Sequence, residues 1–329
     1  MKILEIIDIK NNSDIIFAKN TLRNLLKRLD SKYDSFLIFS LMELSTNLIK
    51  HANSGKIYLL QSASEIMLCA LDYGVGIKNI EWSMQSGTTQ MDNSLGMGLH
   101  QMNSDNHYNI EVISFTQESL HGTIVLVKPR NFNPNILSLQ LLYPTEKLCG
   151  DLFTKKGRFL LLADASGHGR KAHKSAEYIK EYFLQNSFSC LLIDEFFAKL
   201  HEELKQKKLR GAVLSLFEIS KSSIRICGVG NISLWQKKDG NYKYSSQKDG
   251  IIGEYFSSAQ TKEFKLNEMD SIIASTDGID TRMMNKILSK IPKNTSPAMI
   301  ALCSMHFASI KYDDKTILII KGIKDEPRF

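Results

Sequence analysis

Residues 158–172 read RFLLLADASGHGRKA, and this stretch gives the strongest indication of the fold. The apolar run at 158–163 predicts a buried strand, and the pattern at 169–185 predicts a helix. Between the two, Asp164 opens a loop that contains Gly167 and Gly169. An aspartate at the end of a buried strand is either a turn residue or a ligand, and this stretch alone leaves both readings open.

Further aspartates lie beside apolar runs in the second half of the chain. They are Asp151 in CGDLF, Asp277 after SIIAST, and Asp313 and Asp314 before KTILII. Taken singly, each is more often a turn residue. Together they favour a site for hard divalent cations, which bind carboxylate oxygens from separate loops. Two such ions position a water for attack on phosphorus, and the glycine-rich loop lets the carbonyl of Ala165 join the coordination sphere.

The motifs GD, DxxGHGxxA, GVGN, TDGI and DDKT occur in this chain and resemble the SpoIIE-type (RsbX-like) protein phosphatases of the PPM superfamily over residues 138–322. The resemblance implies a two-metal site holding Mn²⁺ or Mg²⁺ and hydrolysis of phosphoserine or phosphothreonine in proteins. It places Asp164 and Asp277 at the centre of catalysis and gives Asp313 the task of orienting its neighbour. The implied metal ligands are Asp151, Asp164, the carbonyl of Ala165, Asp277 and Asp314.

Two positions near these motifs leave alternatives open. His168 is either a general acid for the leaving serine oxygen or a residue that only fills the loop. Asp280-Thr281 follows TDGI where the family usually has Glu-Ala, so the start of the next helix is open while the metal residues are retained.

The first half of the chain contains a second set of polar residues. Glu43 and Asn47 are four residues apart on a largely apolar helix predicted over 34–52, so they share a face. They are either solvated, or a base and a Mg²⁺ ligand. Asp72 follows a predicted strand, where its carboxylate can accept a hydrogen bond from an adenine amino group. Gly74 and Gly76 let the backbone approach the ring.

Two more elements complete this set. Gly96 and Gly98 precede a short predicted helix, where backbone amides bind phosphate oxygens, and Thr123 opens a strand near the base. With ELSTNLIKHANSGKI, DYGVGI, SLGMGLHQM and HGTIVLV, residues 1–130 resemble GHKL ATPases, in particular the RsbT-like serine kinases. The resemblance implies binding of ATP and Mg²⁺, with Glu43 as general base, Asn47 on Mg²⁺ and Asp72 on adenine. Val75 replaces the proline common in that family.

The elements predict an α+β protein of two domains. A GHKL (Bergerat) α/β sandwich is expected over 1–130, a linker over 131–137, and an αββα phosphatase sandwich over 138–329. Predicted helices are 13–30, 34–52, 97–104, 169–185, 192–207, 281–290 and 296–308. Predicted strands are 56–61, 65–71, 110–116, 122–128, 137–142, 158–163, 211–219, 223–228, 231–236, 242–245, 270–275 and 315–321.

Composition excludes several other classes of protein. The net charge is +7 and the pI about 9.0, but the lysines are scattered and the run at 205–210 has no interleaved aromatic residues, so no nucleic-acid surface is indicated. Five cysteines without a CxxC pair fit a reducing cytosol. No signal peptide or membrane-spanning run is recognised, so a cytoplasmic protein with no membrane partner is expected.

The sequence therefore predicts an ATP-dependent serine kinase joined to a phosphatase, both acting on STAS-domain anti-anti-sigma or stressosome-type proteins in bacterial partner switching. This last step rests on family analogy. Other partners considered are a downstream phosphatase and a sigma-regulating protein, and a homodimer is compatible with the GHKL resemblance. A first alternative makes the N-terminal domain a nucleotide-dependent binding module without kinase activity. A second makes the phosphatase domain a degenerate scaffold.

Overall fold

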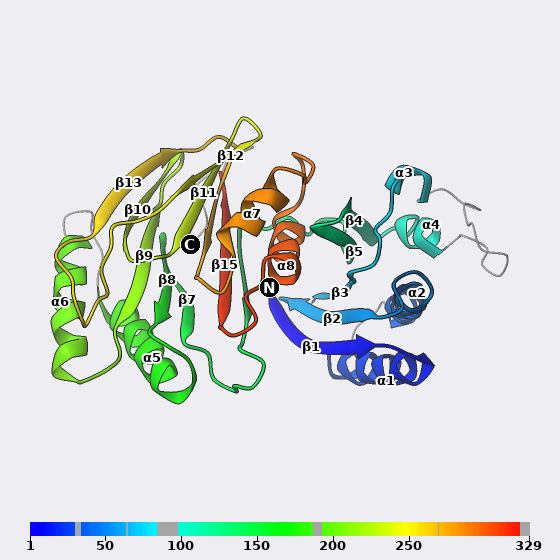
Figure 1. Ribbon diagram of the computed structural model, residues 1–329, viewed down its shortest axis with the longest axis horizontal. Coiled ribbons are helices and arrows are strands. Elements are labelled where there is room, and N and C mark those ends of the chain that lie inside the picture. Colours follow the sequence, from blue (N-terminus) through cyan, green and yellow to red (C-terminus); the bar gives the residue numbers. More distant parts are fainter. Residues whose placement is uncertain (30–33, 64, 84–97, 187–192, 269, 323–329) are drawn as a thin grey trace. The chain divides into compact units, whose positions relative to one another are not determined.

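The structure is a computed structural model that describes residues 1–329 except 30–33, 64, 84–97, 187–192, 269 and 323–329 (Figure 1). The chain divides into two compact units, Met1–Asn133 and Pro134–Phe329. The α+β class expected from the sequence is confirmed, with three antiparallel five-stranded sheets.

Unit 1 is built around one sheet. The strand order is β1-β2-β3-β5-β4. Its strands are β1 (Lys2–Ile9), β2 (Gly55–Ser62), β3 (Glu65–Leu71), β4 (Tyr108–Gln117) and β5 (Leu120–Pro129), and its helices are α1 (Asn12–Leu29), α2 (Asp34–Ala52), α3 (Ile80–Ser83) and α4 (Gly98–Asn103). Ala18, Leu22 and Leu26 recur every four residues on α1, and they join one core with alternate residues of the sheet such as Ile57 and Leu59.

Unit 2 contains the other two sheets, ordered β13-β10-β9-β8-β7 and β12-β11-β14-β15-β6. The first sheet consists of β7 (Asp151–Lys156), β8 (Phe159–Ala165), β9 (Ala212–Ile219), β10 (Ser223–Val229) and β13 (Gln260–Lys265). The second consists of β6 (Ile136–Leu141), β11 (Ser233–Lys238), β12 (Asn241–Ser245), β14 (Ser271–Ser275) and β15 (Lys315–Lys321). The helices are α5 (Gly169–Gln185), α6 (Ile193–Gln206), α7 (Thr281–Leu288) and α8 (Pro297–Phe307).

Strand β8 explains why these layers stack. Leu160 and Leu162 join the core between the two sheets. Their neighbours Leu161, Ala163 and Ala165 join a different core, built with α5 and α6. Because successive side chains of a strand point to opposite faces, an unbroken apolar run is buried on both sides. Helices α7 and α8 contact the second sheet, giving the helix–sheet–sheet–helix layers visible in Figure 1.

Several boundaries differ from the sequence expectations for identifiable reasons. β1, β7 and β13 lie where no strand is predicted, because charged residues such as Glu5 and Asp8 interrupt the apolar pattern of β1 and β13 is mostly exposed. β6 begins at Ile136, inside the range expected to be a linker. The open helix start is resolved for α7, where the side chain of Asp280 caps the helix by accepting the N–H of Met283 at 2.6 Å.

Candidate active sites

Asp151 and Asp164 lie opposite each other on neighbouring strands of unit 2. Asp151 opens β7, Asp164 is near the end of β8, and the two are paired in the antiparallel ladder. Side chains of such a pair have Cβ atoms about 4.5–5.5 Å apart, and like charges there are destabilising. Asp151 is buried, with 5% of its surface exposed. The ladder thus brings together two residues that the sequence predicts to be partners.

The electrostatic environment of these carboxylates favours their protonated forms. Burial raises the pKa of Asp151 to about 7, although a hydrogen bond from the Thr276 hydroxyl at 2.7 Å acts in the opposite direction. The pKa of Asp164 is raised well above its usual range, first by burial and then by the charges of Asp151, Asp277 and Asp313. Asp151 is buried and Asp164 half-buried, so two carboxyl groups that both resist ionisation need a cation if both are to be charged.

Asp277 and Asp313 complete the carboxylate cluster. Asp277 follows β14, is exposed to solvent, and accepts a hydrogen bond from the Asn231 side chain at 2.9 Å. The pKa of Asp313 is raised by burial and by the charges of Asp277 and Asp314. Asp313 therefore interacts with two of the carboxylates that the sequence assigns to the metal site, and Asp277 opens the cluster to solvent.

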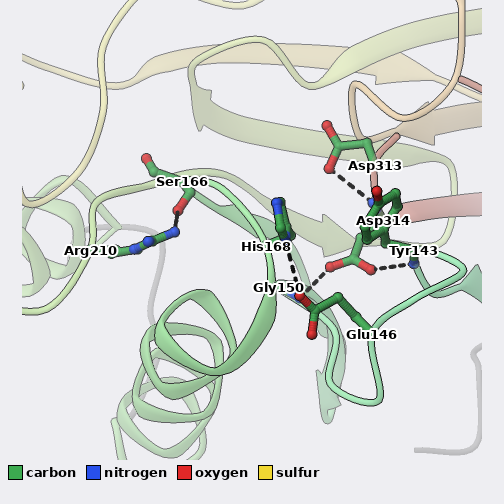
Figure 2. Close-up of polar contacts among 8 residues, drawn as sticks. All are labelled: Tyr143, Glu146, Gly150, Ser166, His168, Arg210, Asp313 and Asp314. Carbon is green, nitrogen blue, oxygen red and sulfur yellow. Dashed lines mark hydrogen bonds and ion pairs between the residues drawn. The ribbon is translucent and has the colours of Figure 1, made fainter. Parts of the chain in front are cut away.

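Asp314 is engaged differently. One carboxylate oxygen accepts the backbone N–H of Tyr143 at 2.8 Å, and the other accepts that of Gly150 at 2.6 Å. Figure 2 shows the carboxylates of Asp313 and Asp314 pointing to different sides, with that of Asp314 facing the segment 143–150. The contacts of Asp314 fix this segment in place.

The carbonyl of Ala165 lies beside the same segment. The N–H of Ala165 donates to the carbonyl of Gly150 at 3.2 Å. A Cβ at position 150 would lie 3.4 Å from the Ala165 oxygen and only 2.9 Å from Cβ of Ala172. Glycine at position 150 therefore lets the segment pack against the loop that follows Asp164.

The donor set fits a hard divalent cation in its chemistry. All candidate donors are oxygens, which Mg²⁺ and Mn²⁺ prefer. Among the residues that the structure describes, no three His, Cys, Asp or Glu side chains form a ready set of metal ligands. The carboxylates are neighbours in the fold, and the charge of Asp277 acts on both Asp164 and Asp313.

Asp72 of unit 1 organises the turn that follows β3. Its Oδ1 accepts the backbone N–H of Gly74 at 2.7 Å and that of Thr123 at 3.1 Å. Burial raises the pKa of this carboxyl, and the two backbone hydrogen bonds act in the opposite direction. The structure therefore brings together three of the residues assigned to the adenine end of the predicted nucleotide site.

Gly76 is required by the path of this turn. Its φ is 79°, and a Cβ there would lie 2.1 Å from the Phe115 carbonyl oxygen. The chain is held against β4 because Ile77 N–H donates to the Ser114 hydroxyl at 2.7 Å, and this hydroxyl lies 2.8 Å from that of Thr123. Ser114 is a residue that the sequence motifs do not indicate.

Helix α2 connects the two ends of the predicted nucleotide site. A Cβ at Gly98, the first residue of α4, would lie 2.3 Å from Oε2 of Glu43. At the other end of α2, a Cβ added at Gly74 would lie 3.1 Å from Cβ of Ala52. Asn47 lies between these points on the same helix. Gly96 lies outside the described residues.

Comparisons with known proteins give fold-level likenesses only. No protein-family model matches the sequence, and no curated protein matches it. A crystal structure of RsbX with magnesium is 21% identical, covering 56% of this chain and 92% of that chain at a TM-score of 0.47. PppA of Pseudomonas aeruginosa, described as a key regulatory component of T6SS, is 12% identical. The match covers 56% of this chain and 96% of that chain, at a TM-score of 0.49.

The catalytic domain of the serine/threonine phosphatase PstP with two manganese ions is 12% identical, covering 56% of this chain and 96% of that chain at a TM-score of 0.46. Among the described residues, no helix is both long and apolar enough to cross a bilayer.

Proposed function

We propose that unit 2 is a divalent-metal-dependent phosphatase for phosphoserine and phosphothreonine in proteins. The observation that supports it best is the pairing of Asp151 with Asp164 across β7 and β8, with Asp277 and Asp313 close enough to raise the pKa of Asp164. Such a concentration of carboxylates is costly in a folded protein unless it serves a cation or a reaction.

The residues proposed to hold the metal are Asp151, Asp164, the carbonyl of Ala165, Asp277 and Asp313. Bound there, divalent ions would supply Lewis acidity to the phosphoryl group and to an attacking water. Thr276 orients Asp151, and Asn231 orients Asp277. Asp314, assigned by the family resemblance to the metal, is instead proposed to hold segment 143–150, and Asp313 takes its place as a ligand.

If Asp313 binds the metal and Asp314 holds segment 143–150, changing Asp313 should weaken Mn²⁺ binding, whereas changing Asp314 should lower the stability of the protein. We expect Asp313→Asn to weaken Mn²⁺ binding by more than about 100-fold, because loss of a ligand should exceed the roughly 10- to 100-fold cost of losing a residue that only supports one. Asp314→Ala leaves two backbone N–H groups without acceptors and is expected to lower the free energy of unfolding by about 1–3 kcal/mol. Calorimetric Mn²⁺ titration and urea denaturation of the full chain measure the two quantities. Weaker Mn²⁺ binding in Asp314→Asn than in Asp313→Asn would contradict these roles.

We further propose that unit 1 binds ATP with Mg²⁺, with Asp72 at the adenine, Thr123 beside it, and Asn47 on Mg²⁺. The hydrogen-bonded turn at Asp72, together with the approach of Glu43 to Gly98, supports this proposal. In this proposal Glu43 is the base that would accept a proton from a protein serine during phosphoryl transfer. A nucleotide-dependent binding module without transfer is the alternative.

The substitution Asp72→Asn tests the proposed contact with ATP without disturbing the fold. We expect Asp72→Asn to weaken ATP binding by roughly 10- to 100-fold, the value of a hydrogen bond to a charged group. Asparagine keeps the Oδ1 atom that accepts the backbone N–H groups of Gly74 and Thr123, so the variant should fold like the wild type. Fluorescent-nucleotide titration measures the affinity, and Asp8→Asn, which alters an exposed ion pair with Lys56 on the same sheet, is the control. Equal affinity in both variants would contradict the assignment of Asp72.

The proposed protein substrate is a phosphorylated STAS-domain protein of the stressosome type, because the motifs of both halves resemble partner-switching enzymes. The kinase proposal is tested by incubating the full chain with labelled ATP and a STAS-domain protein. Transfer of label to the STAS-domain protein, and its loss in Glu43→Gln, would support the proposal. ATP binding without transfer would leave the binding-module alternative.

A further inference from the structure

A cavity of about 650 Å³ lies along one face of α5 in unit 2. The α5 residues that line it recur at intervals of three or four, so they form one continuous stripe of the helix. They are Arg170, His173, Lys174, Glu177, Tyr178 and Glu181. Leu148 of segment 143–150 completes the lining together with Lys207 and Leu209, which follow α6. Three separate stretches of unit 2 therefore enclose the cavity.

The wall that carries Leu148 is held in place from two sides. Nδ1 of His173 donates to the Cys149 carbonyl at 3.0 Å, which ties the wall to α5. Oε1 of Glu146 lies 3.1 Å from Nδ1 of His168, and Figure 2 shows this contact between segment 143–150 and the loop before α5. The cavity is thus formed without a ligand, as is usual for binding sites.

One end of the cavity lies beside the carboxylate cluster. Asp151 opens β7 directly after segment 143–150, and Asp164, near the end of β8, is joined to α5 by one short loop. A Cβ at Gly150 would lie 2.9 Å from Cβ of Ala172, on the first turn of α5. The first turns of α5 are therefore the end of the cavity nearest the proposed phosphatase site.

Charge is distributed unevenly between the two ends of the cavity. Arg170 and Lys174, at the near end, are exposed, and neither forms an ion pair with any residue that the structure describes. Glu177 and Glu181 lie further along the stripe. Free cations at the near end attract acidic groups, whereas the two carboxylates disfavour a polyanion such as a nucleic acid. The lining therefore favours a polypeptide that is acidic at one end.

The length and walls of the cavity also suit a polypeptide. From Arg170 to Glu181 the helix rises about 16 Å at roughly 1.5 Å per residue, the span of about five residues of extended chain. Leu148, Leu209 and the ring of Tyr178 offer apolar surface along it. An extended segment can place side chains on this surface and on the charged groups at the same time.

We propose that this cavity binds an acidic segment of the protein substrate that flanks the phosphorylated residue, an inference that rests on the proposed phosphatase function. Arg170 and Lys174 bind carboxylates close to the phosphoserine or phosphothreonine. Further from the phosphoryl group, Glu177 and Glu181 accept hydrogen bonds from the same segment. The metal residues interact with the phosphoryl group alone, so this cavity adds selection among phosphoproteins.

Paired phosphoserine peptides test the cavity in the Mn²⁺-loaded full chain. One peptide of each pair carries glutamates on one side of the phosphoserine, and the other carries glutamines at the same positions. We expect kcat/KM to favour the glutamate peptide by about 10-fold or more for one of the two sides, since an exposed ion pair contributes up to about 5-fold and at least two form. Because each ratio compares two peptides in one variant, any change at the metal site cancels.

A matched pair of variants assigns this selectivity to the cavity. Lys174→Glu replaces attraction by repulsion and is expected to lower the selectivity by about 10-fold, and Arg170→Gln by up to about 5-fold. Lys171→Glu makes the same charge change at an exposed position of α5 outside the lining, and should retain the selectivity. Equal kcat/KM for the glutamate and glutamine peptides in the wild type, or equal losses in Lys171→Glu and Lys174→Glu, would overturn the inference.

Binding to the metal-free chain separates docking from hydrolysis. Fluorescence anisotropy of a labelled, unphosphorylated glutamate peptide is measured with the full chain in EDTA. We expect Lys174→Glu to weaken this binding by about 10-fold and Lys171→Glu to leave it unchanged. Equal affinity in these two variants would also overturn the inference. Binding that depends on Lys174, in a wild type that hydrolyses neither the peptides nor p-nitrophenyl phosphate, would instead overturn the proposed phosphatase function.

Discussion

Asp164→Asn is expected to abolish Mn²⁺-dependent hydrolysis of p-nitrophenyl phosphate by the full chain. Loss of a residue that merely supports a metal ligand costs 10–100-fold, so loss of a ligand should exceed about 100-fold. The physical reason is that Asp164 faces Asp151 across the ladder, and the proposed cation would offset the charges of both. Asparagine has nearly the same shape and removes one of two opposed charges, so the metal-free variant should be at least as stable as the wild type.

Two variants make this result specific. Asp277→Asn should behave like Asp164→Asn, because Asp277 is among the charges that act on Asp164. Asp249→Asn changes an exposed aspartate of the same unit and should retain full activity. Activity that survives both Asp164→Asn and Asp277→Asn would show that the site is misassigned.

Stability of the metal-free chain is expected to fall as the pH rises from 5 to 8. The folded-state pKa of Asp151 is about 7, above its ordinary value of 3.8. A carboxyl whose pKa is raised by folding stabilises the protein fully below the unfolded pKa, and this contribution is lost as the pH rises through the folded pKa. The midpoint of unit 2 should fall by roughly 5–10 °C across this window.

Mn²⁺ should remove this dependence, because metal binding displaces the protons and offsets the charges. Scanning calorimetry of the full chain at several pH values, with EDTA or with Mn²⁺, measures both curves. The Asp151→Asn chain provides the control, since its metal-free midpoint should be less sensitive to pH. A flat wild-type curve in EDTA, or an equal fall in Mn²⁺, would contradict the electrostatic description of the cluster.

Regular elements were predictable because their patterns are local. Helix α2 spans Asp34–Ala52, as predicted, because its apolar residues recur at helical spacing and Asn53-Ser54-Gly55 ends it. Strand β7 was missed because Asp151 opens it and lysines follow within five residues, so its apolar run is too short to be recognised.

The candidate sites were only partly predictable, because hydrogen-bond partners distant in sequence decide the roles. Nothing in the run DDKT distinguishes Asp313 from Asp314. Their difference arises from backbone N–H groups of Tyr143 and Gly150, over 160 residues away. Glu146 lies in an irregular segment without a motif, and only its distance to His168 draws attention to it. Thr276, by contrast, stands directly before Asp277 in the TDGI motif, and a closer reading of that motif could have found it.

Anomalous diffraction at the manganese edge, from crystals of the full chain grown with Mn²⁺, tests the central claim most directly. The proposed function predicts at least one strong peak bounded by Asp151, Asp164, Asp277 and Asp313, with carboxylate oxygens at roughly 2.0–2.6 Å. An anomalous map with no peak among these four carboxylates, or with manganese bound only elsewhere, would contradict it.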